Sequence, residues 1–266
     1  MKINYQETTN DLLARIDIHS KYGSRDIDEW MLDLLKVKKG SRILDVGCGA
    51  GKQCFLFHKA LQGNAEITGG DVNEELLVKA RAENAKTGDA IRFINLDFNK
   101  RFPFEDNQFD LLTACFTIYY AADIAFTISE MQRVLKSGGQ MFTTGPMPDN
   151  KHLFYEIIHE ATGKPIPPMP GSSRYGSSIL QAIQEVCSSV EVHIFENPLT
   201  FEQVEPFLAY TRASLSEDRR LWTSLFEGAE GFEKVMRQIE AVATHRLAQD
   251  GKLVMTKVVG GFLGTK

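Results

Sequence analysis

The chain has 266 residues, with 30 Lys and Arg against 35 Asp and Glu, a formal net charge of −5 and 43% hydrophobic residues. These values are ordinary for a globular protein, and the length excludes a small disulfide-stapled scaffold. The mild negative charge argues against a dedicated nucleic-acid binder, which usually carries a basic stripe.

No segment has the properties of a membrane span or a secretion signal. The longest runs without a charged residue, such as residues 111–122, are shorter than the ~20 apolar residues of a spanning helix, and the polar N-terminus lacks a signal-peptide core. The protein is therefore expected to be cytoplasmic, with no membrane partner. The cysteines form no C-x-x-C pair and have no His at zinc-finger spacing, so we expect free thiols and no metal site.

The first half of the chain alternates between helical and strand patterns. A helix is predicted from Asp26, which with Glu29 resembles a capping box, and it leads into residues 38–40. Helices are also predicted over residues 73–86 and 124–135, the second closed by a left-handed glycine in residues 136–139. Nearly continuous apolar runs, typical of strands buried in a parallel sheet, occupy residues 42–46, 66–72, 91–98, 109–115 and 140–144. This order predicts right-handed βαβ units.

The second half differs in composition, because six of the nine prolines fall between Pro146 and Pro170. A helix over residues 150–161 inside this segment indicates an insertion. The remaining elements are expected to be a Gly/Ser-rich loop at 171–178, a helix to 186, a strand at 190–195, helices within 206–248 and a strand at 253–262.

The segment that carries chemistry is the run I-L-D-V-G-C-G-A-G-K at residues 43–52, an apolar strand leading into a glycine-rich turn at a helix start. Glycines let the backbone approach a ligand, and the helix N-terminus presents unpaired N–H groups. Asp71 ends the second strand twenty residues after Gly51, where a carboxylate can accept both hydroxyls of a ribose. Asp97 and Phe98 end the third strand and could meet an adenine ring. Together they predict an adenosine-containing ligand.

These residues resemble the class I S-adenosylmethionine-dependent methyltransferases, in particular the small-molecule group with a D-V-G-C-G-x-G motif. Asp71 matches the family's ribose-binding acid and Asp97 its adenine-side acid. The run R-V-L-K-S-G-G at residues 133–139 resembles the family's R-V-L-K-P-G-G, with Ser137 in place of proline. The resemblance covers about residues 38–145.

The resemblance implies an α/β, Rossmann-like methyltransferase fold, with a seven-stranded, mostly parallel sheet, an antiparallel final strand and helical cap insertions. We expect a single domain over residues 1–266. Its expected parts are an N-terminal helical arm (1–35), a cofactor-binding core (36–145), a lid insertion (146–178) and a C-terminal part of the sheet (179–266) with a helical cap insertion (202–250).

The resemblance also implies S-adenosyl-L-methionine as cofactor and S-adenosyl-L-homocysteine as product. In the family an N-terminal arm often covers the cofactor, so Arg25 could bind the methionine carboxylate; the alternative is a solvated residue before a helix cap. The cofactor-binding residues implied are Tyr22, Arg25, Asp45, Gly47, Cys48, Gly49, Gly51, Gln53, Asp71, Val72, Asp97, Phe98, Cys115 and Phe116.

Two rival nucleotide sites fit the sequence less well. A dinucleotide fingerprint G-x-G-x-x-G needs its third glycine where Lys52 stands, and no Tyr-x-x-x-Lys pair occurs in the chain. A phosphate-binding Walker loop needs Ser or Thr where Gln53 stands.

Methyl transfer from a sulfonium is an in-line displacement, so an enzyme must align the acceptor and exclude water. In the resembling family the acceptor lies above the end of the fourth strand, here residues 113–120. The candidate catalytic residues are Tyr119, Tyr120 and His152, although aromatic residues after a strand often only pack. His19, His159 and His193 are further candidates for a general base.

We therefore expect a methyltransferase that acts on an O or N atom of a small-molecule acceptor, mainly by proximity and orientation. The absence of a basic stripe makes a nucleic-acid acceptor less favoured. Two alternatives remain open: methylation of a protein side chain, and a regulator that binds S-adenosylmethionine without turnover. The sequence names no particular acceptor and no oligomeric state.

Overall fold

The computed structural model describes every residue except 1–8, 167–169, 218–221, 223–224 and 227. Parts of the expected N-terminal arm, lid and cap therefore lie outside the described residues. The strands are β1 (Arg42–Val46), β2 (Glu66–Asp71), β3 (Ile91–Asn95), β4 (Phe109–Cys115), β5 (Leu135–Pro146), β6 (Ser189–Phe201) and β7 (Leu253–Thr265). The helices are α1 (Thr9–Tyr22), α2 (Ile27–Leu35), α3 (Lys52–Ala60), α4 (Glu74–Asn84), η1 (Ala85–Thr87), η2 (Ile118–Tyr120), α5 (Ile124–Val134), α6 (His152–Thr162), α7 (Pro170–Arg174), η3 (Tyr175–Ile179), α8 (Leu180–Val186), α9 (Val204–Glu217) and α11 (Gly228–Asp250).

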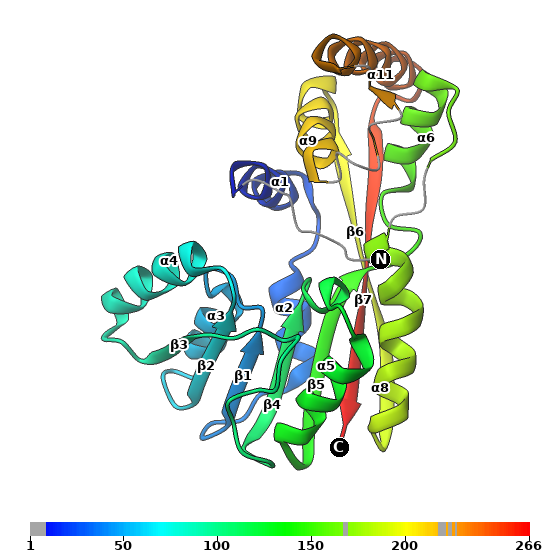
Figure 1. Ribbon diagram of the computed structural model, residues 1–266. Coiled ribbons are helices and arrows are strands. Elements are labelled where there is room, and N and C mark those ends of the chain that lie inside the picture. The colour runs from blue at the N-terminus through cyan, green and yellow to red at the C-terminus, as the bar shows by residue number, and fades with distance from the viewer. Residues whose placement is uncertain (1–8, 167–169, 218–221, 223–224, 227) are drawn as a thin grey trace.

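The strands form one seven-stranded sheet in the order β3-β2-β1-β4-β5-β7-β6 (Figure 1). Neighbours among β1 to β5 pair in parallel, whereas β7 pairs antiparallel with both β5 and β6. This arrangement confirms the expected Rossmann-like architecture. The carboxyl ends of the parallel strands lie along one edge of the sheet, which is where ligands bind in such folds.

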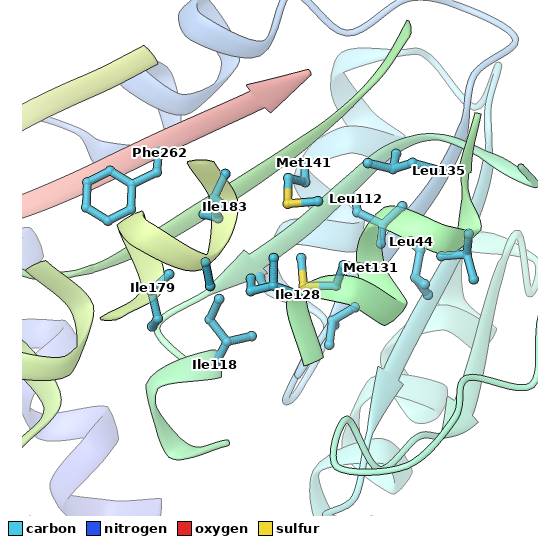
Figure 2. Close-up of a cluster of buried hydrophobic side chains, with 14 of the residues drawn as sticks. Leu44, Leu112, Ile118, Ile128, Met131, Leu135, Met141, Ile179, Ile183 and Phe262 are labelled. Carbon is cyan, nitrogen blue, oxygen red and sulfur yellow. The ribbon is translucent and has the colours of Figure 1, made fainter. Parts of the chain in front are cut away.

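Helices cover both faces of the sheet, and the alternation of side chains along the strands separates two cores. Phe262 of β7 packs with α5, η3 and α8, in the cluster drawn in Figure 2. Its neighbour Leu263 points to the other face and packs with α2, α3 and α4. The nearly continuous burial of β1 and β4 follows from this double cover, as expected for central parallel strands.

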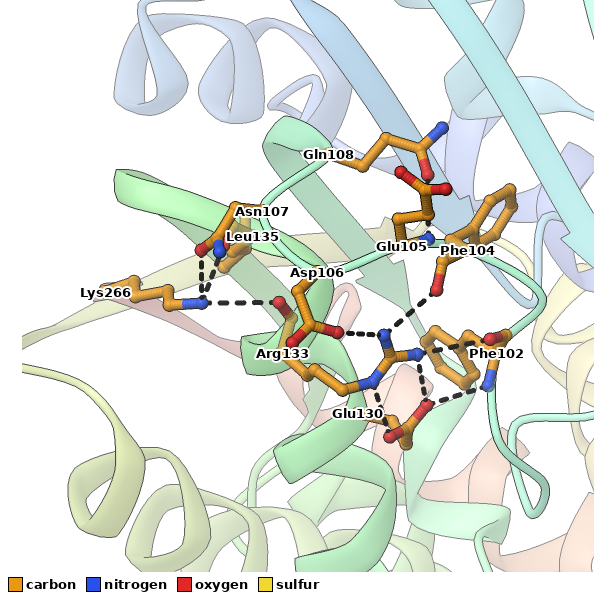
Figure 3. A network of polar contacts seen from close by, with 10 residues as sticks. All are labelled: Phe102, Phe104, Glu105, Asp106, Asn107, Gln108, Glu130, Arg133, Leu135 and Lys266. Carbon is orange, nitrogen blue, oxygen red and sulfur yellow. Dashed lines mark hydrogen bonds and ion pairs between the residues drawn. The ribbon is translucent and has the colours of Figure 1, made fainter.

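Arg133, in the run that resembles the family's R-V-L-K segment, fixes the loop before β4 (Figure 3). Its guanidinium donates to both oxygens of Glu130 at 2.8 Å and to Asp106 Oδ1 at 2.7 Å. It also donates to the carbonyls of Phe104 and Phe102. The helix predicted over residues 124–135 ends at Val134, one residue earlier, because Leu135 has extended backbone and starts β5. The glycine with a left-handed backbone in the following turn is Gly138.

The expectation of a loop at residues 171–178 is wrong. α7, η3 and α8 run as one helical segment from residue 170 to 186. Tyr175 is fully buried, stacks on Phe262 with 4.6 Å between ring centroids, and donates its hydroxyl hydrogen to the Thr143 carbonyl at 2.7 Å. This packing outweighs the weak helix propensity of the Gly and Ser residues. Tyr175 therefore faces the core rather than a substrate.

β6 and β7 continue beyond the rest of the sheet and carry a second lobe. The last residue of β5, Pro146, pairs with Val259, so residues 253–258 of β7 pair with β6 alone. This two-stranded ribbon holds α1, α6, α9 and α11 (Figure 1). These helices share a core of their own, which includes Phe154, Phe201 and Trp222. None of the described helices is both long enough and apolar enough to cross a membrane.

Candidate functional site

The glycine turn joins β1 to α3 at the carboxyl edge of the sheet. Gly47, Gly49 and Gly51 have φ values of 70°, 54° and 87°, a region that side chains disfavour. The N–H groups of Gly47 and Cys48 donate to the Gly70 carbonyl at 2.7 and 3.0 Å, which ties the turn to β2. A Cβ on Gly47 would lie 2.1 Å from Thr117 Oγ1. The backbone of this turn therefore requires glycine.

Asp71 lies beside the turn, at the end of β2. Its Oδ2 accepts from the Gly49 N–H and its Oδ1 from the Asn73 N–H, both at 2.8 Å. A carboxylate oxygen has two acceptor sites, so each oxygen keeps one for a ligand hydroxyl. The adjacent Val72 side chain is 53% exposed and offers an apolar surface next to that carboxylate. This arrangement suits a ribose with an attached base.

Asp45 lies beneath the turn rather than at its surface. The side chain is buried, and its Oδ1 accepts from Thr113 Oγ1 of β4 at 2.7 Å. Burial raises the pKa of Asp45 to about 7, although hydrogen bonds from Thr113 and Cys54 oppose the rise. The carboxyl group thus links β1 to β4 under the glycine turn. Its expected cofactor contact stays a prediction.

The end of β4 lies beside the glycine turn, because Thr117 packs against Gly47. Burial raises the pKa of the Cys115 thiol, whose sulfur lies 3.8 Å from Met31 Sδ. Phe116 follows with a φ of 55° and a 40% exposed side chain. Tyr119, in contrast, is buried, with its ring 4.6 Å from that of Tyr120. Of this group, Phe116 is the side chain most open to a ligand.

Asp97 and Phe98 follow β3, whose last residue is Asn95 rather than the predicted Phe98. Asp97 accepts from the Asn99 N–H at 3.0 Å and pairs with Lys100 at 3.1 Å. Partial burial opposes ionisation, but these contacts hold the pKa of Asp97 below its usual value. Phe98 is half-buried against the sheet core. Both residues therefore follow the third strand instead of ending it, and their contact with the adenine ring stays a prediction.

The N-terminal arm contacts β6 through the two residues expected to bind cofactor. The Arg25 guanidinium lies 4.7 Å from the Phe195 ring centroid and donates to the Glu196 carbonyl at 3.0 Å. The Tyr22 ring packs on Phe201. The arm reaches the glycine turn through a different residue, Asp28 of α2, whose Oδ1 lies 2.9 Å from Lys52 Nζ. Sequence reasoning missed this ion pair, since no local pattern joins its two residues.

The remaining candidates lie in two settings. Gln53 is half-buried in the first turn of α3, and Cys48 is buried within the glycine turn. His152 is exposed on α6, with its Nε2 3.2 Å from Glu156. His152 therefore lies on the surface of the second lobe, and its catalytic role stays a prediction. Within the described ranges, no group of three His, Cys, Asp or Glu side chains could hold a metal ion.

Comparison with known proteins also points to methyltransferases. Residues 37–166 match the model of a methyltransferase domain family. A demethylmenaquinone methyltransferase from Staphylococcus carnosus is 37% identical over 136 residues, which cover 51% of this chain and 53% of the relative. One from Staphylococcus haemolyticus is 34% identical over 145 residues, covering 51% and 60%. The chain thus spans about half the length of the curated relatives it matches.

Two solved structures share the fold. The YcgJ protein of Bacillus subtilis aligns with a TM-score of 0.58 at 16% identity, over 90% of this chain and 97% of that one. Phosphoethanolamine N-methyltransferase 2 of Haemonchus contortus, in complex with S-adenosyl-L-methionine, aligns with a TM-score of 0.55 at 18% identity, over 97% and 57%. At these identities the likeness shows the fold alone.

The residues present fit the cofactor that this fold implies. Asp71 keeps acceptor sites for two ribose hydroxyls, Val72 offers an apolar surface, and the glycine turn admits close approach to the backbone. The match of residues 37–166 to a methyltransferase domain family and the shared Rossmann-like fold therefore both support S-adenosylmethionine as the cofactor.

Proposed function

We propose that this chain transfers a methyl group from S-adenosylmethionine to an O or N atom of a small-molecule acceptor. The observation that carries the proposal is the single surface formed by the glycine turn, Asp71 and the end of β4. When bound, S-adenosylmethionine supplies an activated methyl group. The turn would bring backbone N–H groups to the cofactor, Asp71 would accept from its ribose, and Val72 would pack against its base.

Five further residues complete the proposed cofactor contacts. Asp97 and Phe98 extend the adenine side from the end of β3, and Phe116 is exposed at the end of β4. Gln53 lies in the first turn of α3. Arg25 would reach the cofactor only by leaving the Phe195 ring, so we give it the weakest part in the proposed site.

The side chains near the end of β4 favour alignment over acid–base chemistry. The raised pKa of Cys115 keeps its thiol protonated at neutral pH. Tyr119 is packed between Tyr120 and Tyr175. The proposed contribution of the chain is therefore to orient the acceptor and exclude water, effects that can supply about 7–11 kcal/mol of a barrier.

The names of the relatives support a small acceptor. Those matched in sequence are called demethylmenaquinone methyltransferases, and one matched in fold is called a phosphoethanolamine N-methyltransferase. A phosphorylated amine is accordingly the first acceptor class to assay, and a demethylated quinone, which would take the methyl group on a ring carbon, is the acceptor class that would contradict the O or N assignment. The protein-methylating and the regulatory alternatives make different predictions in the same assay.

The test is release of S-adenosylhomocysteine by the full chain, with S-adenosylmethionine and a panel of small acceptors. We expect turnover with at least one small acceptor. Turnover only with protein substrates would contradict the small-molecule proposal. Tight binding of S-adenosylmethionine with no turnover on any acceptor class would favour the regulator.

A further inference from the structure

A buried lysine lies where the β6–β7 ribbon leaves the sheet. Lys257 is 9% exposed, two residues before Val259, which pairs with the last residue of β5. Its Nζ donates to the Tyr210 hydroxyl at 3.2 Å and lies 5.7 Å from that ring's centroid. Within the described residues, this lysine makes its hydrogen bond with a phenol and not with a carboxylate. A buried ammonium in such a setting is costly unless a further group compensates it.

Other cationic or polar side chains from separate elements gather around Tyr210. Lys151, which precedes α6, is 8% exposed, with its Nζ 5.9 Å from the Tyr210 centroid. His19 of α1 stacks on Tyr210 at 5.8 Å between centroids. Its Nε2 is buried, with no hydrogen-bond partner among the described residues. The cap cationic cluster is defined here as Arg15, His19, Lys151, Tyr210 and Lys257.

The pKa shifts of Tyr210 and Lys257 show the effect of the neighbouring cations. Burial would raise the pKa of Tyr210, but the charges of Lys151, Lys257 and Arg15 bring it down to about 8. Burial and the charges of Lys151 and Arg15 lower the pKa of Lys257 to about 8, although Tyr210 alone would raise it. Cations from several elements therefore act on Tyr210 and Lys257.

The charge of Lys52, next to the glycine turn, also affects the pKa of His19. Burial lowers the pKa of His19 well below its ordinary value, and the charges of Lys257, Arg15, Lys151 and Lys52 add to the shift. Lys52 is the first residue of α3, directly after the turn. His19 is therefore within electrostatic reach of the residue that follows the glycine turn.

We propose that the cap cationic cluster binds an anionic group, a carboxylate or a phosphate, carried by the methyl acceptor. This inference rests on the proposed function, because it assigns the acceptor's polar end to the helical lobe and its reacting atom to the end of β4. Lys257 Nζ and His19 Nε2 would donate to the anion, since charge-assisted hydrogen bonds of this kind are about twice as strong as neutral ones. Arg15 and His19, both on α1, are half-buried as whole residues.

The experiment measures binding of two anionic probes, benzoate and phenyl phosphate, and of the neutral benzyl alcohol, by calorimetry with S-adenosylhomocysteine present. The proteins are the full chain, Lys257→Met, and the matched control Lys252→Met, whose lysine is exposed just before β7. We expect saturable binding of at least one anion, and no binding of benzyl alcohol. Which anion binds identifies the carboxylate or the phosphate as the group recognised.

The variants distinguish anion binding by the cap cationic cluster from attraction by the overall charge of the protein. Lys257→Met should weaken anion binding at least tenfold, whereas Lys252→Met should change it less than twofold. Tyr210→Phe breaks the same hydrogen bond but keeps every cation, so it should weaken anion binding only severalfold. It therefore shows whether loss of that bond alone, and not loss of the lysine charge, explains the result for Lys257→Met. Equal anion affinity in the full chain and Lys257→Met, or no saturable binding of either anion, would overturn the inference. Titration of S-adenosylhomocysteine alone tests the cofactor site separately, so failure of the two proposals can be distinguished.

Discussion

The glycine turn and the cap cationic cluster are built in opposite ways. The turn occupies five consecutive residues whose backbone needs positive φ values at three glycines, and Asp71 joins it from the next strand. The cluster draws its side chains from α1, α9, β7 and the segment before α6. The turn thus acts through backbone shape and the cluster through side-chain charge. Mutations should damage the two regions by different physical routes.

Arg133 provides a third reference point for this comparison. Its guanidinium faces the carboxylates of Glu130 and Asp106, so its charge is neutralised within the chain. Lys257 faces a phenol. The ion pairs of Arg133 are completed within the chain, whereas we propose that a ligand completes the surroundings of the Lys257 ammonium. Four predictions test these distinctions.

The largest effect is expected for Gly47→Ala, which should lower affinity for S-adenosylhomocysteine more than a hundredfold by calorimetry. The new Cβ would lie 2.1 Å from Thr117 Oγ1 and must displace the turn. The matched control is Gly40→Ala, because Gly40 has a φ of 80° but no atom within 4 Å of an added Cβ. The control separates backbone strain from collision. Near-normal binding by Gly47→Ala would break the claim that the turn acts through its backbone.

Arg133→Met should lower the free energy of unfolding by about 2–3 kcal/mol, because it leaves Glu130 only 11% exposed and without its ion pair. Lys257→Met should change it by less than about 1 kcal/mol, or raise it, because it removes a buried cation and fills the space with an apolar chain. Urea denaturation measures both. A larger loss for Lys257→Met than for Arg133→Met would show that the lysine is structural.

Tyr119→Phe and Tyr120→Phe should each lower kcat less than about a hundredfold once an acceptor is identified. Tyr119 is packed against Tyr120 and Tyr175, so we expect its ring to contribute more to the shape of the site than its hydroxyl does to the reaction. His152→Ala should have a similarly small effect, since His152 is exposed beside Glu156. A thousandfold loss at one of these residues, with an ionisation missing from its pH profile, would establish a dedicated general base.

The smallest effect is spectroscopic. Of the seven tyrosines, one should ionise near pH 8 in a titration followed at 295 nm, because cations lower the pKa of Tyr210 to about 8. Between about pH 8 and 10 the unfolded chain then binds more protons than the folded one, so Tyr210 adds stability as the pH rises through this window. The early ionisation should vanish in Tyr210→Phe and move upward in Lys257→Met. Absence of a tyrosine ionisation near pH 8 would refute the effect of the cations on Tyr210.

The contrast between the two regions also explains what the sequence could predict. The glycine turn, Asp71 and the alternation of strands and helices follow from local patterns, and the sheet order confirmed the resulting fold. Residues 171–178 were expected to form a loop because their composition is Gly- and Ser-rich, whereas burial of Tyr175 decides their helical state. β6 extends to Phe201, beyond the predicted end at 195, because its whole length pairs with β7.

The cap cationic cluster could not be predicted for a similar reason. Tyr210 and Lys257 are 47 residues apart, and nothing in the local sequence of either indicates the other. Only His19 had been a candidate, as a possible base, and the structure stacks it on Tyr210 instead. Contacts that depend on the path of the β6–β7 ribbon need the fold before they can be seen.

The most direct test of the account is calorimetric titration of S-adenosylmethionine into the full chain and into Asp71→Ala, with the exposed Asp250→Ala as control. Hydrogen bonds to a charged acceptor are each worth about 1.5–3 kcal/mol, so loss of those from a ribose should weaken binding at least tenfold. Asp250→Ala should bind as the unaltered chain does. Unchanged affinity in Asp71→Ala, or tight binding of a nicotinamide dinucleotide by the unaltered chain, would contradict the assignment.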